Sequence, residues 1–124
     1  MAKNEGDSTN STFSLDYLNE VADGNQEFIK EMIDIFLEDM PKFMQEIVEC
    51  TEDENFDCVQ RLAHKSKSMA GYIMAEDLQE KFKTLESMAS ADDIVTEDVE
   101  KLVSQLDNQT SSIVAKLKEH FNTI

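Results

Sequence analysis

Apolar side chains recur every three or four residues through most of this chain, and this period constrains the fold more than any other feature. The sequence has only three glycines and one proline in 124 residues, and alternating apolar and polar residues, typical of strands, are rare. The period therefore predicts an all-α protein. It is clearest in residues 26–50, where one wide face carries Phe28, Ile29, Met32, Ile33, Phe36, Met40, Phe43, Met44, Ile47 and Val48.

The stretches of sequence with this spacing are one short helical segment and four long ones, joined by short connections. Short connections favour antiparallel neighbours, so we expect an up-down-up-down four-helix bundle with a short additional N-terminal helix. Ser14 is the expected N-cap of the short helix, and Thr96 is that of the last one. Pro41 should bend its helix rather than end it, because the apolar period continues beyond it. The expected segments are residues 14–22, 26–50, 55–73, 76–88 and 96–121.

The two ends of the chain differ in composition. Residues 1–12 are polar and rich in Ser, Thr, Asn and Gly, so we expect a disordered tail followed by one bundle domain at residues 13–124. The tail lacks the apolar core of a signal peptide, and no stretch reaches the roughly 20 apolar residues of a membrane span. The sequence thus favours a cytoplasmic protein without membrane insertion. The short tail and long final helix favour a free-standing protein or a complete module.

Cys50 and Cys58 are the only cysteines, and they flank the expected turn between the second and third helices. Their spacing does not match a Cys-x-x-Cys metal or redox site. In a reducing cytoplasm we therefore expect two ordinary thiols, buried or exposed.

The net charge of −16 comes from 27 acidic residues against 11 lysines and arginines. Such a surface repels phosphate backbones and anionic membranes, which argues against nucleic-acid binding. The basic residues are clustered, however. Within residues 61–83, five basic residues stand against three acidic ones, and this positive island can steer an anionic partner. The basic members are Arg61, Lys65, Lys67, Lys81 and Lys83.

His64 lies on the solvent side of the third expected helix. The buried stripe of that helix carries apolar and small residues, and the opposite stripe carries polar ones together with this histidine. His120, near the C-terminus among charged residues, is expected to be an ordinary solvated side chain. The buried stripe is Phe56, Val59, Leu62, Ala63, Ser66, Met69, Ala70 and Ile73; the opposite stripe is Asp57, Gln60, Arg61, His64, Lys67, Ser68 and Gly71.

Several chemistries lack the residues that they need. A di-metal bundle site uses Glu-x-x-His pairs, but Arg61 and Leu117 stand three residues before the two histidines. The chain has no Gly-x-Ser-x-Gly turn for a hydrolase and no glycine-rich loop for a nucleotide phosphate. A nucleophilic His64 remains, since neutral imidazole, with a pKa near ~6.5, is a competent nucleophile. Lys67, one turn on, can stabilise a phosphoryl group, and small Ser68 leaves room for a partner.

The stretch Leu62-Ala63-His64-Lys65-Ser66-Lys67-Ser68 resembles the Ala-His-x-x-Lys-Gly pattern of histidine-containing phosphotransfer (HPt) domains, which act in multistep phosphorelays of the two-component type. The resemblance covers about residues 14–123. It includes Leu78, Leu85-Glu86 and the proline-bearing stretch Phe36-Leu37-Glu38-Asp39-Met40-Pro41. Two positions depart from the family pattern, because Ser68 and Met74 stand where glycines are usual.

The resemblance implies that His64 accepts a phosphoryl group from a receiver-domain aspartate and passes it to another receiver domain. Such a phosphoprotein is a carrier, without kinase activity of its own, that works as a monomer in signal transduction with receivers and a hybrid sensor histidine kinase. It implies no bound cofactor or metal, since the receiver supplies Mg²⁺. Lys67 then lies beside the phosphoryl group. Residues that flank the histidine or dock the partner are Arg61, Lys65, Ser68, Gly71, Lys83, Glu86, Leu15 and Leu18.

A second reading from a different class remains open. A helical adaptor could bind receiver or kinase domains through the same surface without accepting phosphate. The two readings differ in one outcome, because an adaptor keeps binding and signalling when His64 is replaced by glutamine.

Overall fold

The computed structural model describes residues 13–122, with side chains up to residue 119. All regular secondary structure in this range is helical. The expected tail at residues 1–12 and the side chain of His120 therefore lie outside the described residues. A short helix precedes four long ones, and no strand occurs among the described residues, as predicted. The helices are α1 (Asp16–Ala22), α2 (Gln26–Glu52), α3 (Phe56–Tyr72), α4 (Glu76–Ala89) and α5 (Thr96–Asn122).

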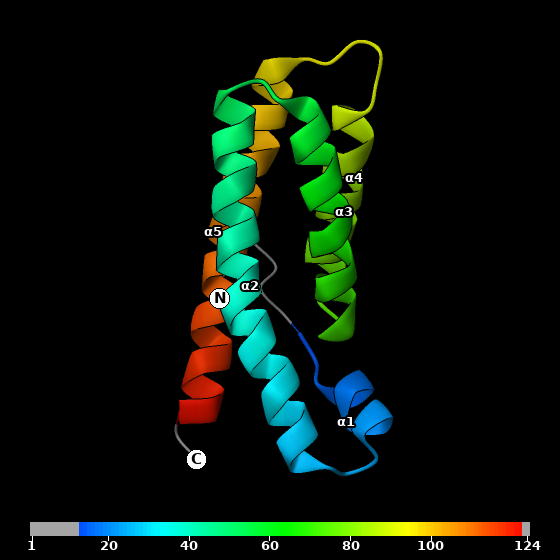
Figure 1. Cartoon of the computed structure of the whole chain (residues 1–124), viewed down its shortest axis with the longest axis vertical. Helices are drawn as coiled ribbons and strands as arrows, with labels where there is room; N and C mark the ends of the chain where they lie inside the picture. Colours follow the sequence, from blue (N-terminus) through cyan, green and yellow to red (C-terminus); the bar gives the residue numbers. More distant parts are fainter. Residues whose placement is uncertain (1–12, 123–124) are drawn as a thin grey trace, which may run out of the picture.

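The four long helices form an antiparallel bundle in which each packs against two others (Figure 1). Helix α2 contacts α3 and α5, and α4 contacts the same two helices from the other side. Helix α1 lies against α2 at one end of the bundle, while the loop between α4 and α5 crosses the opposite end. The predicted bundle with a short N-terminal helix is confirmed.

Buried apolar side chains from every helix form one core. Its largest fully buried members include Phe82, Ile33, Met40, Ile47 and Leu106, which come from α2, α4 and α5. Helix α2 runs unbroken through Pro41, and the ribbon changes direction partway along the helix (Figure 1). The proline thus bends the helix without ending it.

Asparagine side chains start two of the long helices. Asn25 accepts a hydrogen bond from the backbone N–H of Phe28 at 3.1 Å, and Asn55 accepts one from that of Cys58 at 3.3 Å. α1 begins at Asp16 with Leu15 at the cap position, one residue later than expected, but the Ser14 hydroxyl still accepts a hydrogen bond from the Asp16 N–H at 3.1 Å. The backbone N–H of Ser14 donates to the carbonyl of Ile73 at 2.7 Å, which connects the start of α1 to the end of α3.

Buried polar contacts fix α4 against α5. Gln109 of α5 is fully buried; its amide oxygen accepts a hydrogen bond from Lys81 at 2.9 Å, and its amide nitrogen donates to Asp77 at 2.9 Å. Lys81 and Asp77 also pair directly at 3.1 Å on α4. Since a buried amide is costly unless its polar atoms are satisfied, this triangle favours one register of α4.

The two cysteines are joined in a disulfide, so the expectation of two thiols is wrong. Cys50 near the end of α2 and Cys58 in the first turn of α3 bring their Cα atoms to 6.1 Å across the turn. The sequence pattern missed the bond because it depends on how the ends of two helices approach each other, within the spacing that a disulfide requires.

Reducing this disulfide is expected to lower the free energy of unfolding by about 2–3 kcal/mol, since the bond closes a loop of eight residues' separation and restricts the unfolded chain. Urea unfolding with and without dithiothreitol measures the difference. A Cys50→Ser/Cys58→Ser double variant is the control, because its stability should not respond to the reductant. Equal stability of the oxidised and reduced wild-type protein would contradict the expectation.

Met74 occupies a strained position in the turn between α3 and α4. Its φ angle is 52°, in the left-handed region, and the turn is closed by a hydrogen bond from the Ala75 N–H to the Ala70 carbonyl at 3.0 Å. Glycine is the usual residue at such a helix end, because a Cβ atom costs energy there.

Met74→Gly is therefore expected to raise the free energy of unfolding by about 0.5–1 kcal/mol, since relief of strain exceeds the added entropy of the unfolded chain. The side chain is 40% exposed, so little packing is lost. Met74→Ala keeps a Cβ atom and is the matched control, for which no gain is expected. Urea unfolding gives the free energy of unfolding of the wild type and the two variants. Equal free energies for the glycine and alanine variants would refute the role of strain.

Candidate functional site

His64 projects from the middle of α3, on a helix held in place by its buried face. Val59, Ala63 and Ala70 are completely buried on that face, and Leu62 is 4% exposed. The side chain of His64, in contrast, is 62% exposed. A solvent-facing imidazole on a packed helix is accessible to a macromolecule while its backbone stays fixed.

Glu86 of α4 holds the histidine ring on one side. Its Oε2 atom lies 2.8 Å from Nδ1 of His64, across the interface between α3 and α4. Its other oxygen, Oε1, lies 2.8 Å from Nζ of Lys67. One carboxylate thus bridges the two residues that the sequence singled out, and it is less exposed than the imidazole, at 22% of its side chain.

Charge and hydrogen bonding determine which imidazole nitrogen is free. The hydrogen bond from Lys67 lowers the pKa of Glu86, and the hydrogen bond from His64 lowers it further, although partial burial acts in the opposite sense. Glu86 is therefore ionised near neutral pH and can only accept hydrogen bonds. It follows that Nδ1 of His64 carries the proton, so a neutral ring has its lone pair on Nε2, the nitrogen away from Glu86.

Lys67 lies one turn beyond His64 on the same side of α3, and its side chain is 26% exposed. Its ammonium group pairs with Glu86 rather than with solvent alone. A cation in this position can turn to a negatively charged group on His64, and Glu86 keeps it nearby until then.

The other expected flanking residues lie around this centre in different settings. Arg61, Ser68 and Lys83 are exposed, while Gly71 is partly buried beside the Gln79 side chain. Lys65 is also exposed, and its ammonium lies 5.9 Å from the centre of the Phe43 ring on α2.

Leu15, at the N-cap of α1, and Leu18, within α1, do not offer an exposed docking surface. Leu15 is partly buried against the core, and Leu18 is 2% exposed. Leu18 packs α1 onto the bundle and also lines a hollow beside His64, so its contact with a partner stays a prediction.

An apolar hollow of about 360 Å³ lies beside His64, between α2 and α3 and next to α1. Ile35 on its rim is 53% exposed, although it lies outside the main stripe of α2. Tyr72 at its far end stacks on Tyr17 of α1, with ring centres 6.2 Å apart. The family resemblance pointed to the first short helix and the nearby face of the second as receiver contacts, which is where this hollow lies, but it singled out none of the α2 residues, Ile35 included. The lining is Leu18, Met32, Ile33, Ile35, Phe36, Asp39, Phe43, His64, Lys65, Ser68, Met69, Tyr72 and Ile73.

Metal ligands are not grouped in the part of the chain that the structure describes: no three His, Cys, Asp or Glu side chains lie close enough to hold an ion. None of the described helices has the length and apolar character needed to span a membrane.

The comparison with protein families identifies the class of this bundle. The family model described as Hpt domain matches residues 31–116, a span that includes α3, α4 and most of α2 and α5. The chain belongs to the Hpt domain family, whose members take part in histidine phosphotransfer within phosphorelays. No curated protein and no solved structure matches the chain.

Proposed function

We propose that this protein is a phosphorelay intermediate in which Nε2 of His64 accepts a phosphoryl group from a receiver-domain aspartate and passes it to a second receiver domain. The observation that carries the proposal is the bridge of Glu86 to both His64 and Lys67, each at 2.8 Å. This bridge leaves Nε2 as the available nucleophile and keeps a cation beside it. Membership in the Hpt domain family supports the same activity.

The proposed transfer follows from these contacts. The Nε2 lone pair attacks the phosphorus of the aspartyl phosphate, a P–N bond forms, and the P–O bond to the aspartate breaks so that a carboxylate leaves. The imidazole ring gains a positive charge, which the Glu86 carboxylate stabilises through the Nδ1–H hydrogen bond. The Lys67 ammonium stabilises the negative charge on the phosphoryl oxygens. The reverse sequence, with another receiver aspartate as the attacking group, completes the relay.

The surface around His64 is suited to such a partner. Exposed Arg61, Lys65 and Lys83 give this side of a strongly acidic protein a basic rim, which would steer the acidic pocket of a receiver. The neighbouring hollow is lined mainly by apolar side chains and can receive an apolar side chain of the partner. In this proposal the protein is a cytoplasmic monomer that binds no metal of its own, and the receiver supplies Mg²⁺.

Label transfer between purified domains tests this function. A receiver domain carrying ³²P on its aspartate is mixed with the protein, and then a second, unlabelled receiver is added. We expect label to move first onto this protein, as an acid-labile and alkali-stable phosphohistidine, and then onto the second receiver. Binding of receivers without uptake of label would instead favour the adaptor reading.

Glu86→Ala is expected to slow phosphorylation of His64 by phosphoramidate, a small phosphoryl donor, about 10–100-fold. This range corresponds to the roughly 1.5–3 kcal/mol of a hydrogen bond to a charged group. The ring also becomes free to take either tautomer, so the product should contain both Nδ1- and Nε2-phosphohistidine.

Quench-flow rates and NMR of the product measure the two effects. Glu86→Gln retains an acceptor and should lie between the wild type and the alanine variant. Glu80→Gln, an exposed position on the same helix, is the control for loss of one negative charge. A Glu86→Ala protein with the wild-type rate and a single product would remove Glu86 from the proposed mechanism.

A further inference from the structure

A second surface feature lies on the seam between α2 and α5, away from the residues around His64. Two hollows of about 530 and 320 Å³ share Val48 and Asp107, so they follow one another along this seam. None of their lining residues belongs to the phosphotransfer site. The first is lined by Pro41, Met44, Gln45, Val48, Asp107, Thr110, Ser111, Val114, Ala115 and Lys118, and the second by Val48, Thr51, Glu52, Glu100, Val103, Ser104 and Asp107.

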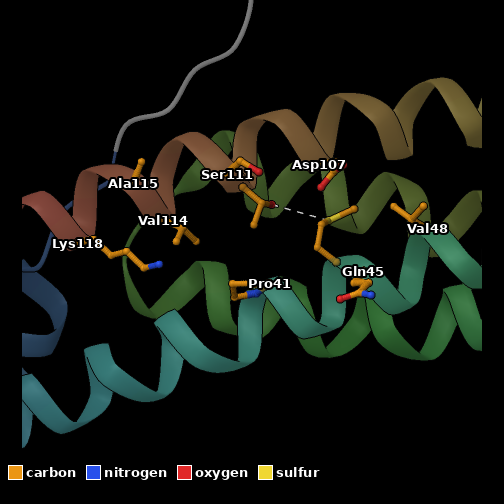
Figure 2. A pocket seen from close by; sticks show the side chains of 10 residues that line it. Pro41, Gln45, Val48, Asp107, Ser111, Val114, Ala115 and Lys118 are labelled. Atoms are coloured by element: carbon orange, nitrogen blue, oxygen red, sulfur yellow. Dashed lines mark hydrogen bonds between the residues drawn. The ribbon is translucent and has the colours of Figure 1, made fainter.

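Short side chains leave the seam unfilled. On α5 the wall includes Ser104, Ser111 and Ala115, all exposed, and on α2 the compact ring of Pro41 lies across the first hollow from Ser111 and Ala115 (Figure 2). Met44 and Thr110 are buried among the lining residues of the first hollow, with the Thr110 hydroxyl 3.9 Å from the Met44 sulfur. The result is a groove with a largely apolar floor and small walls, the form that receives an amphipathic helix.

The length and the charge of the groove restrict its occupant. From Pro41 to Glu52 the α2 side extends for about 17 Å, which corresponds to three turns of a helix. One end carries the carboxylates of Glu52 and Glu100, and Asp107 lies where the two hollows meet, whereas Lys118 is the only cation among the lining residues. The chain's own residues 1–12 are almost entirely polar and lack the apolar side chains to cover this floor.

We propose that the α2–α5 groove binds a basic amphipathic helix of about three turns from a partner protein. The apolar face of that helix covers Met44, Val48 and Val114, and its basic residues lie along the acidic end of the groove. Because this surface shares no residue with the His64 site, both can be occupied together. The inference stands independently of phosphotransfer.

A synthetic peptide tests the inference. The probe is a fluorescein-labelled, 14-residue helical peptide with leucines on one face and lysines beside them, titrated with the full-length protein and followed by anisotropy. Two control peptides are titrated in the same way: a scrambled peptide, whose leucines share no face, and a peptide with glutamate in place of lysine. We expect only the basic amphipathic peptide to bind, with NMR shift changes confined to residues along the α2–α5 seam.

Matched variants separate groove binding from attraction to an acidic protein. Ser111→Trp fills the groove, and Asp107→Lys reverses charge on its wall; each is expected to weaken binding at least tenfold. Asn108→Trp, exposed on α5 but outside the lining, and Glu80→Lys on α4 are the controls and should change binding less than twofold. Equal weakening by Glu80→Lys, no effect of Ser111→Trp, or equal binding of the scrambled peptide would overturn the proposal. A dimer in sedimentation that Ser111→Trp dissociates would also overturn it, with a second copy as occupant.

Discussion

Replacement of His64 by glutamine is expected to abolish phosphoryl uptake, both from a receiver aspartyl phosphate and from phosphoramidate. The amide nitrogen of glutamine is not a nucleophile, so it cannot form the P–N bond that the imidazole forms. The His64 side chain is 62% exposed and contributes no core packing, so the fold should survive the change. Incorporated ³²P or intact mass measures the loss, with a complete absence of label as the expected value.

Two controls make this result specific. His120→Gln removes the other histidine of the chain and should leave phosphorylation unchanged. Circular dichroism and receiver binding of the His64→Gln protein show whether the bundle and its docking surface persist. Label that remains on the His64→Gln protein would contradict the assignment of this residue as the acceptor.

Leu62→Ala is expected to lower the free energy of unfolding by about 2–5 kcal/mol. Leu62 is 4% exposed and lies on the buried face of the helix that carries His64. Truncation removes apolar contacts and leaves a cavity where α3 meets the core, which the neighbouring helices can fill only in part.

The adjacent exposed position provides the matched control. Arg61→Ala, one residue earlier in α3, should change the free energy of unfolding by no more than about 0.5 kcal/mol, because this side chain faces solvent. Urea unfolding of both variants gives the comparison. A Leu62→Ala protein as stable as Arg61→Ala would mean that the face assignment of α3 is incorrect.

The helices could be predicted from the sequence because their apolar period is continuous, whereas their ends depend on contacts that the period does not show. Helix α2 extends two residues beyond the expected Cys50, since Thr51 is buried and its hydroxyl donates to the Ile47 carbonyl at 2.7 Å. The pattern treated this threonine as part of a polar turn. Helix α1 starts later than expected, and the Ser14 N–H before it is bonded to the Ile73 carbonyl at the end of α3, a contact between distant parts of the chain.

In the candidate site, too, features within one helix could be predicted, whereas features that depend on contacts between helices could not. His64 and Lys67 could be paired from their spacing on one helix, but the Glu86 bridge needs the register between α3 and α4, which spacing along a single helix does not give. The hollow beside His64 depends on the packing of α2 against α3, and so its rim residue Ile35 carried only a weak signal. The disulfide likewise depends on a distance between helix ends.

The position of the phosphoryl group on the protein is the most direct test of the central claim. The wild-type protein, labelled with ¹⁵N and phosphorylated by a receiver domain, is examined by two-dimensional NMR that correlates the imidazole nitrogens with ring protons and phosphorus. We predict a single phosphohistidine, at Nε2 of His64, because Glu86 holds the proton on Nδ1. A phosphoryl group on Nδ1 of His64, on another residue, or on no residue at all would contradict the account.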